Sequence, residues 1–449
     1  MNASIRGANA IPVACEQGVI IGQIRYQNLL TTGTRAPPPA SGVRSIRREG
    51  VTTVALVVLC QTFPALSFGA IALFLPLLRV DLQMTFSQAG MLSAASTLTY
   101  ALCQIPAGYY SDRIGPGRLF FVGVLGTTLL MLSFGFVHTF ELAVLNQLVS
   151  GIFRALMFAP GLALLTSWFP PERRATAMGL YVVGGFSGNI ILSLAGPALM
   201  NHYGWRFAII FFAVVGIGGA MLYLAFGREK PRTTPRQMVG ATDLFQLFKY
   251  RIMWVCGGIQ FIRLGVAVSF NFWLPSLLVA ERGLSIQAAG LVMAMGAGFT
   301  VLSNALGGYV SDRLRNPPLV IGVSLAVMAC TSMLLGLVHS IPVLLVVIAV
   351  NSIFLQFYFG ALFYVPVEVL GQRVAGMSTG FSNLFANIGA LTFAYLLGVV
   401  KDEAGTFMWG FIGIGAACVI GVVLAIVLAR LRKQAMGAAP DPAPRIGGA

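Results

Sequence analysis

The sequence predicts an all-α integral membrane protein in which twelve transmembrane helices form two pseudo-symmetric bundles of six. Three observations lead to this prediction: long uncharged apolar runs, a one-sided distribution of basic residues, and an internal repeat. Of the 449 residues, 57% are hydrophobic and 10% are charged, whereas a soluble domain carries about 25% charged residues. A chain this apolar cannot cover a water-facing surface, so it must lie in lipid.

The apolar runs are long enough to cross a membrane as helices. The runs 319–338 and 407–428 contain no charged residue, and about 20 apolar residues span the hydrocarbon core. Lipid offers no partners for backbone N–H and C=O groups, so these runs must be helical, and the alternation typical of a membrane β-barrel is missing from the sequence. We expect spans near residues 53–78, 86–108, 119–138, 143–166, 176–198, 206–226, 253–278, 286–309, 319–338, 341–365, 376–399 and 409–430.

Basic residues favour one set of loops. Only Arg79, Arg206, Arg282 and Lys401 lie in loops that follow odd-numbered spans, whereas the terminal segments and the other loops hold nearly all the rest of the 29 Lys and Arg. Short cytoplasmic loops carry such an excess. We therefore expect a multi-pass protein of the cell inner membrane with both termini in the cytoplasm. This distribution accounts for the net charge of +15 without nucleic acid as a partner.

Polar segments flank and divide the two bundles. Residues 1–50 lack apolar periodicity, and we expect either a disordered cytoplasmic tail there or a true start further downstream. Residues 228–250 are polar, basic and Pro-containing, as expected of a cytoplasmic linker. This linker separates an N-terminal bundle at 51–227 from a C-terminal bundle at 251–431, and residues 432–449 are expected to be a second cytoplasmic tail.

An internal repeat relates the two bundles. The segment GYYSDRI at 108–114 recurs as GYVSDRL at 308–314, and other matches occur at nearly the same spacing, such as Pro76 with Pro275. Several matches in one register indicate a duplication. Parallel repeats within one membrane domain are typical of transporters that bind their substrate near the midplane, between the two repeats.

The repeated segment also carries a family resemblance. The loop at 108–118, with the sequence GYYSDRIGPGR, resembles the G-x-x-x-D-R-x-G-R-R loop of the major facilitator superfamily, and the second copy at 308–313 lies where that family places it, between helices 8 and 9. The resemblance covers residues 51–431 and implies the fold of that family and transport by alternating access. The second copy departs from the pattern at Arg315, where a glycine would stand.

The resemblance implies a conformational latch at the cytoplasmic ends of the helices. The acids of the two loops can lie at positive helix N-termini, which the family suggests are those of helix 11 near Ala375 and helix 5 near Thr176. The alternative is that these residues are solvated loop charges. The expected latch residues are Gly108, Asp112, Arg113, Gly308, Asp312, Arg313, Glu172 and Glu368.

Two arginines lie deep inside predicted spans, Arg154 in helix 4 and Arg263 in helix 7. At a rise of about 1.5 Å per residue, both lie about 20 Å from the cytoplasmic side, one in each bundle. The predicted spans place no Asp, Glu or His at this depth. A buried guanidinium needs acceptors, which an anionic substrate would supply. We therefore expect a two-arginine clamp, and the alternative is that each arginine binds backbone carbonyls or stacks on aromatic rings.

This pattern resembles the organic-anion branches of the superfamily, the anion:cation symporters, in which arginines of helices 1, 4 and 7 bind the anion. Here Pro64 stands at the helix 1 position, and the acids that carry protons in anion:proton symporters are absent from helices 1 and 4. Proton coupling is therefore either absent or carried by the substrate. The other expected substrate-binding residues are Gln61, Gln260, Asn271, Asn387 and Tyr358.

The predicted function is secondary active transport of a small organic anion, with a carboxylate as the expected group, by a monomer in contact with membrane lipid. The alternative is an efflux transporter for a neutral or cationic drug or metabolite. Helix 5 contains Gly184 and Gly188, as exporters do, but its GPALM ending lacks their terminal glycines, so close helix packing is the simpler interpretation. The sequence shows no P-loop, metal-ligand spacing or catalytic cluster, so we expect no enzyme activity, cofactor or metal.

Overall fold

The computed structural model describes residues 40–170, 174–230, 249–370 and 375–437, and each of the twelve expected spans has a helical counterpart there. The prediction of an all-α membrane fold is confirmed. The helices are α2 (Ala40–Cys60), α3 (Thr62–Asp81), α4 (Phe86–Ile114), α5 (Pro116–Phe134), α6 (Phe140–Ser167), α7 (Arg174–Phe226), α9 (Arg251–Ser276), the π-helical η2 (Leu277–Glu281), α10 (Ile286–Leu314), α11 (Pro317–Leu337), α12 (Ile341–Phe357), α13 (Phe359–Leu370), α14 (Ala375–Ala404) and α15 (Met408–Gly437).

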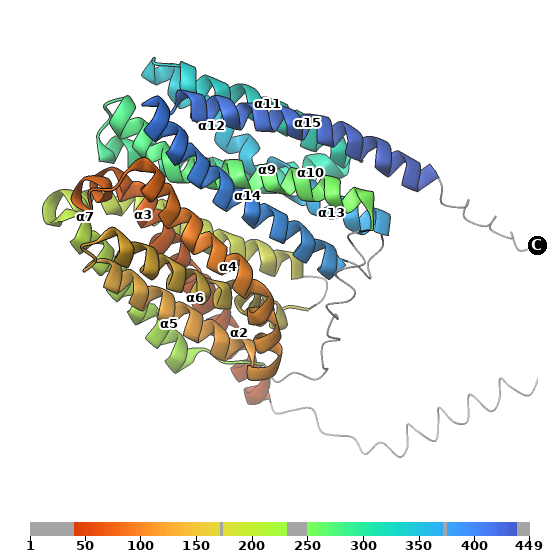
Figure 1. Cartoon of the computed structure of the whole chain (residues 1–449). Coiled ribbons are helices and arrows are strands. Elements are labelled where there is room, and N and C mark those ends of the chain that lie inside the picture. The colour runs from red at the N-terminus through yellow and green to blue at the C-terminus, as the bar shows by residue number, and fades with distance from the viewer. Residues whose placement is uncertain (1–39, 171–173, 231–248, 371–374, 438–449) are drawn as a thin grey trace, which may run out of the picture. The chain divides into compact units, whose positions relative to one another are not determined.

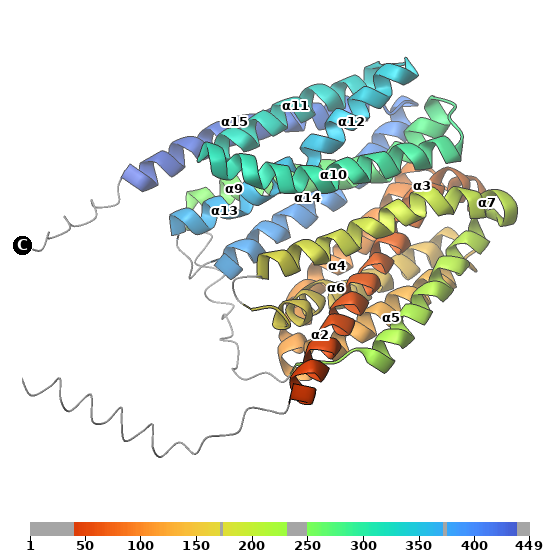
Figure 2. The same ribbon diagram turned by 180° about the vertical axis from the view of Figure 1, so that it is seen from behind.

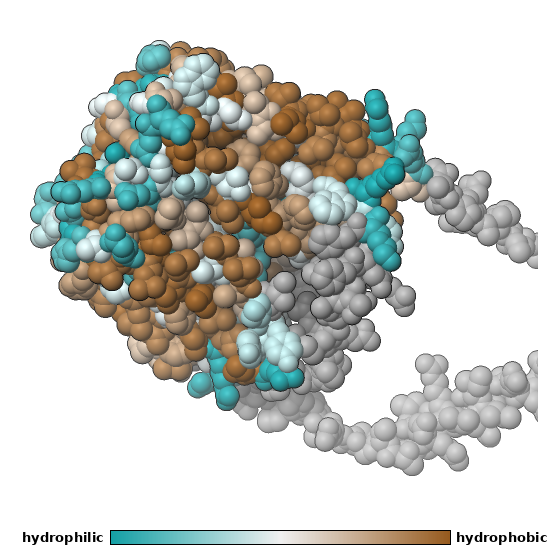
Figure 3. All heavy atoms as spheres, in the orientation of Figure 1, coloured by the Kyte–Doolittle hydropathy of each residue, from teal (hydrophilic) through white to brown (hydrophobic). Residues whose placement is uncertain are grey.

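The helices have the length and surface of membrane spans. Among the described residues, ten helical runs are long and apolar enough to cross a membrane. One of them, Ala177–Phe226, holds two expected spans on either side of Gly204, whose φ of 83° suits glycine alone. Helix α4 is the counterpart of the remaining span. Hydrophobic residues cover the middle of the face in Figure 3, and hydrophilic residues gather toward its two ends.

Two spans that we expected to be continuous are broken. Gln61 separates α2 from α3, because Pro64 has no N–H for the Cys60 carbonyl and its ring would clash there. Tyr358 separates α12 from α13, where α12 passes so close to Gly307 that a Cβ on this glycine would collide with the Phe357 carbonyl. Both breaks lie in spans that contribute predicted substrate-binding residues.

The segments expected to be tails are partly helical. Helix α2 already begins at Ala40 and α15 continues to Gly437, so each extends into a segment predicted to be a tail. The rest of both expected tails, and residues 231–248 of the expected linker, lie outside the described residues. Residues Gly50–Ala449 form one compact unit, and Met1–Glu49 form a second unit. The contacts described below all lie within Gly50–Ala449.

The halves α2–α7 and α9–α15 contact each other mainly through three helix pairs. Helix α4 packs beside α14 and α7 beside α10 (Figures 1 and 2). Helix α3 packs against α9. We name the two ends of these helices by their loops. The motif end carries the repeated loops 108–114 and 308–314, and the far end carries the turns after Asp81 and Ala404.

The helix pairs are tight at the far end and open at the motif end. A Cβ on Gly90 of α4 would lie 2.8 Å from the Ala394 carbonyl of α14, and one on Gly290 of α10 would lie 2.8 Å from the ring of Pro197 in α7. By contrast, a Cβ on Gly108 of α4 would meet no described atom within 4 Å, and the same holds for Gly380, Gly179 and Gly308 in the other three helices. The two halves therefore meet at the far end and are separated at the motif end.

Close packing explains the glycines of helix 5, as the sequence suggested. A Cβ on Gly184 would lie 2.5 Å from the Val58 carbonyl, and one on Gly188 would collide with the Thr62 carbonyl. The first half of α7 therefore lies directly against the backbone around the α2–α3 break. This packing places Gln61 beside α7 and helps to shape the cavity described next.

Candidate substrate-binding site

A cavity of about 340 Å³ lies within the N-terminal half, beside the α2–α3 break. Its walls come from Gln61, from α3, α4 and α6, and from the first half of α7. Phe68 of α3 lines the cavity and also contacts Phe272 of α9, with ring centroids 6.1 Å apart. The cavity thus lies next to the place where the two halves meet. Arg154 is the only charged residue among its lining residues in the described part of the chain.

The guanidinium of Arg154 is held but not fully bonded. Its Nη1 donates a hydrogen bond to the Ser96 hydroxyl at 2.8 Å, and its Cζ lies 4.9 Å from the ring centroid of Phe68 and 5.4 Å from that of Tyr100. Its Nε has no hydrogen-bond partner among the described residues, and neither does Oε1 of Gln61, which lines the same cavity. The aromatic rings and Ser96 therefore orient the cation while part of its hydrogen-bonding capacity stays free.

Arg263 has a different environment. Its side chain is 4% exposed, its Nε donates to Oε1 of Gln260 at 2.7 Å, and its Nη1 donates to Oε1 of Gln356 at 3.2 Å. The guanidinium also lies over the ring of Phe359, at 5.0 Å from the centroid. The sequence treated the two arginines alike, but in this structure only Arg154 lines the cavity, while Arg263 is bound by two glutamines of its own half.

The remaining predicted binding residues lie in the C-terminal half, outside the lining of this cavity. Asn271 and Asn387 each donate to a carbonyl four residues earlier in their own helix, at 2.7 and 2.8 Å. Tyr358 is fully buried at the α12–α13 break, and its hydroxyl has no hydrogen-bond partner in the described ranges. The structure therefore places Gln61 and Arg154 in the lining of one cavity, and Gln260 in a hydrogen bond with Arg263. These are two separate groups of predicted binding residues.

Three charged residues of the predicted latch, Glu368, Arg113 and Arg313, make contacts within their own half of the described structure. Glu368 pairs with Arg432 through two hydrogen bonds of 2.6 and 2.7 Å, within the C-terminal half. Arg113 lies 4.7 Å from the ring centroid of Tyr109, and Arg313 donates to the Tyr309 hydroxyl at 3.4 Å. Glu172 and the side chain of Asp112 lie outside the described residues. Asp312 is exposed, and Gly108 and Gly308 face open space.

The sequence analysis missed a contact that closes the far end. The carboxylate of Asp402 in α14 accepts hydrogen bonds from the backbone N–H groups of Phe86 and Ser87, at 2.8 and 2.6 Å, and from the Ser87 hydroxyl. These are the first residues of α4, so the acid lies at the positive end of that helix. Nearby, Trp273 of α9 donates to the Ala394 carbonyl at 2.9 Å. We call the contact of Asp402 with Phe86 and Ser87, which joins the two halves, the far-end gate.

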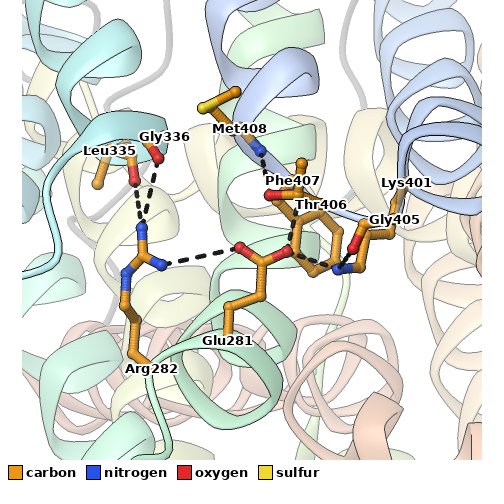
Figure 4. Close-up of polar contacts among 9 residues, drawn as sticks. All are labelled: Glu281, Arg282, Leu335, Gly336, Lys401, Gly405, Thr406, Phe407 and Met408. Atoms are coloured by element: carbon orange, nitrogen blue, oxygen red, sulfur yellow. Dashed lines mark hydrogen bonds and ion pairs between the residues drawn. The ribbon is translucent and has the colours of Figure 1, made fainter.

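Acid–base pairs stabilise the far end of each half. Glu281 accepts hydrogen bonds from Nζ of Lys401 at 2.5 Å and from the backbone N–H of Phe407 at 2.7 Å, and Arg282 donates to carbonyls at the end of α11 (Figure 4). In the other half, Asp81 pairs with Arg206. Asp81 and Glu281 hold corresponding places in the repeat, as the last residues of α3 and η2, so the duplication extends to this pairing.

Glu281→Gln should destabilise the protein more than Asp81→Asn. Lys401 is buried and would keep its charge without a carboxylate beside it. We expect this to lower the free energy of unfolding by about 2 kcal/mol, because removing one partner of a fully buried ion pair lowers it by about 3–5 kcal/mol. The Asp81–Arg206 pair is 39% and 31% exposed at its side chains, so its loss should cost less than about 1 kcal/mol. Thermal unfolding of the two purified variants measures the difference. Equal losses of melting temperature would contradict this assignment.

Comparisons with known proteins agree with this architecture. A model of the Major Facilitator Superfamily matches residues 57–394 and 265–445. A hexuronate transporter of Bacillus subtilis is 23% identical over 409 residues, which cover 85% of this chain and 95% of that protein. A D-galactonate transporter of Escherichia coli is 23% identical over 430 residues, covering 87% and 97%.

A solved structure shows the same fold. It is the crystal structure of a bacterial homologue of the human lysosomal transporter Spinster, in an inward-facing and unoccupied conformation. The TM-score is 0.71 at 18% sequence identity, and the alignment covers 89% of this chain and 98% of that one.

Proposed function

The chain belongs to the major facilitator superfamily, and from this premise we propose that it is a secondary active transporter of a small organic anion, with a carboxylate as the recognised group. The observation that carries the proposal is Arg154, a partly unbonded cation in a cavity without a lining acid among the described residues. A carboxylate would accept a charge-assisted hydrogen bond from this guanidinium. The names of the two relatives, a hexuronate and a D-galactonate transporter, support an anionic substrate.

Transport proceeds by alternating opening of the two ends. In the state described here the far-end gate is formed and the glycines of the motif end face open space, which supports a conformation closed at the far end. The opposite state breaks the bonds of Asp402 to α4 and brings the motif ends together, with Gly108 and Gly308 allowing close helix approach. Bundles 51–227 and 251–431 are the moving bodies.

Orientation follows from the loop charges. We place the motif end, residues 228–250 and both termini in the cytoplasm of a cell with this protein in its inner membrane, because the basic residues concentrate there. Single cysteines introduced at Asn2, Thr233 and Gly448 in a cysteine-free background should resist a membrane-impermeant thiol reagent in intact cells and react after lysis. Labelling at Thr233 in intact cells would contradict this topology.

Asp112→Asn should slow turnover more than it weakens substrate binding. In the proposed cycle this acid lies at the N-terminus of helix 11 only when the motif end is closed, so removing its charge destabilises that state alone. We expect at least a severalfold lower transport rate at unchanged binding affinity, measured on purified protein in liposomes and in detergent. Asp312→Asn provides the matched variant in the second half. A normal rate for Asp112→Asn at normal expression would show that this loop charge is inert.

A ligand screen tests the proposed function. Purified full-length protein would be heated with organic acids, with the neutral amides of the same acids, and with organic amines of similar size. A ligand that binds only the folded state raises the melting temperature according to its concentration and affinity. We expect stabilisation by acids and not by their amides. Stabilisation by neutral or cationic lipophiles in place of acids would favour the alternative, drug or metabolite efflux.

A further inference from the structure

The cavity around Arg154 is rich in aromatic surface. Five of its lining residues are aromatic: Phe68, Tyr100, Phe158, Tyr181 and Phe186. They come from α3, α4, α6 and α7, so aromatic side chains contribute to each of these walls. Such a lining favours a ligand with an apolar or aromatic body, because burial of apolar surface drives its binding.

One tyrosine hydroxyl of this lining is already used by the protein. The Tyr181 hydroxyl donates to the Met157 carbonyl at 2.8 Å. The polar lining residues that remain are Arg154, Tyr100, Gln61 and Asn189. The cavity therefore offers one cation, one hydroxyl and two amides to a ligand.

This set of polar lining groups does not suit a polyhydroxylated acid. A sugar acid carries several hydroxyl groups besides its carboxylate, and each one that leaves water without a hydrogen-bond partner weakens binding. Two carboxamides and one hydroxyl cannot satisfy them all. A second carboxylate would also lack a counter-charge, because Arg154 is the only charged lining residue in the part of the chain that is described.

The rings beside Arg154 point to a specific arrangement. The guanidinium lies over Phe68 and Tyr100, and Phe158 packs edge to face on Tyr181 with ring centroids 6.0 Å apart. A flat ring bearing one carboxylate could place its charge beside the guanidinium of Arg154 and its faces or edges against these side chains, which is the geometry that aromatic groups prefer.

We propose that the substrate is an aromatic monocarboxylate, bound through its carboxylate by Arg154 and through its ring by Phe158, Tyr181 and Phe186. This inference rests on the proposed function and narrows it. It also separates this chain from the two relatives that are named as transporters of a hexuronate and of D-galactonate.

Isothermal titration of the purified full-length protein tests the inference with four probes: benzoate, 2-naphthoate, D-glucuronate and the neutral 2-naphthamide. We expect benzoate or 2-naphthoate to bind at least tenfold more tightly than D-glucuronate and 2-naphthamide, with a negative heat-capacity change from burial of the ring. D-glucuronate binding as tightly as both aryl acids would overturn the inference and leave anion transport standing. Equal binding of 2-naphthoate and 2-naphthamide, or binding of no acid, would overturn the proposed function as well.

A matched pair of variants tests the position of the ring. Phe158→Leu keeps an apolar side chain but removes the aromatic face, and should weaken aryl-acid binding about three- to tenfold. Phe211→Leu is the control, because Phe211 is similarly exposed, at 43% against 42%, and also packs edge to face on a neighbouring ring, but it does not line the cavity. Equal affinities of the two variants would place the ring elsewhere and contradict the proposal.

Discussion

Arg154→Lys is expected to weaken substrate binding about a hundredfold. An ammonium keeps the charge but not the planar set of N–H donors, and losing a charge-assisted pair of hydrogen bonds should cost about 2–3 kcal/mol. Ser96 and the rings of Phe68 and Tyr100 hold the guanidinium in place at the cavity. A lysine side chain cannot reproduce this set of contacts. Titration of the purified variant with a ligand that stabilises the wild type measures the loss.

Arg263→Lys is the matched control for this prediction. Arg263 is also buried in one half of the protein, but its donors are taken by Gln260 and Gln356, and it does not line the cavity. We expect its variant to lose less than about tenfold in affinity and to show a larger effect on transport rate or thermal stability. If Arg263→Lys lost binding as strongly as Arg154→Lys, both arginines would contact the substrate, as in the clamp predicted from the sequence.

The second large effect is expected for Asp402→Asn, which should favour the state open at the far end. The variant loses the negative charge at the N-terminus of α4 and part of the hydrogen bonding to Phe86 and Ser87. Asp402 is exposed, and an exposed charge at a helix terminus contributes about 0.3–1 kcal/mol, so the ratio of the two states should change about two- to fivefold. Spin labels at Glu141 and Ser340, one in each half at the far end, would report a longer distance.

Glu403→Gln supplies the control for the gate. Glu403 neighbours Asp402 and is exposed, and no hydrogen bond or ion pair of its carboxylate occurs among the described contacts. Its variant should leave the distance distribution unchanged. An unchanged distribution in Asp402→Asn would show that the contact with α4 does not hold the far end closed. Combining Asp402→Asn with Asp112→Asn should bring the distribution back toward the wild type, because the two acids stabilise opposite states.

The membrane fold could be predicted because its causes are local in the sequence. Span length, the loop position of basic residues and the repeated GYYSDRI segment can each be recognised without knowing which helices touch. The helix breaks were harder to predict from the sequence. Pro64 signals the break at Gln61, but the break at Tyr358 depends on a close approach of α12 to Gly307 in another helix.

The different roles of the two arginines could not be predicted. Arg154 and Arg263 have the same chemistry and nearly the same depth in the sequence, and they differ only in neighbours that tertiary packing supplies, Ser96 for one and Gln356 for the other. The acid–base pairs at the far end could be predicted only in part from the sequence. Asp81 and Glu281 stand at the same spacing as the two repeated loops, but nothing in the sequence names their partners.

Uptake into proteoliposomes tests the central claim, organic-anion transport through the Arg154 cavity, most directly. Liposomes containing wild-type protein, Arg154→Lys protein or no protein would be given radiolabelled D-glucuronate or 2-naphthoate, and the cationic dye ethidium. We predict that at least one acid enters wild-type liposomes saturably above the protein-free level, that Arg154→Lys abolishes most of this uptake, and that ethidium does not enter. Uptake of ethidium in place of both acids, or acid uptake that is unchanged in Arg154→Lys, would contradict the claim.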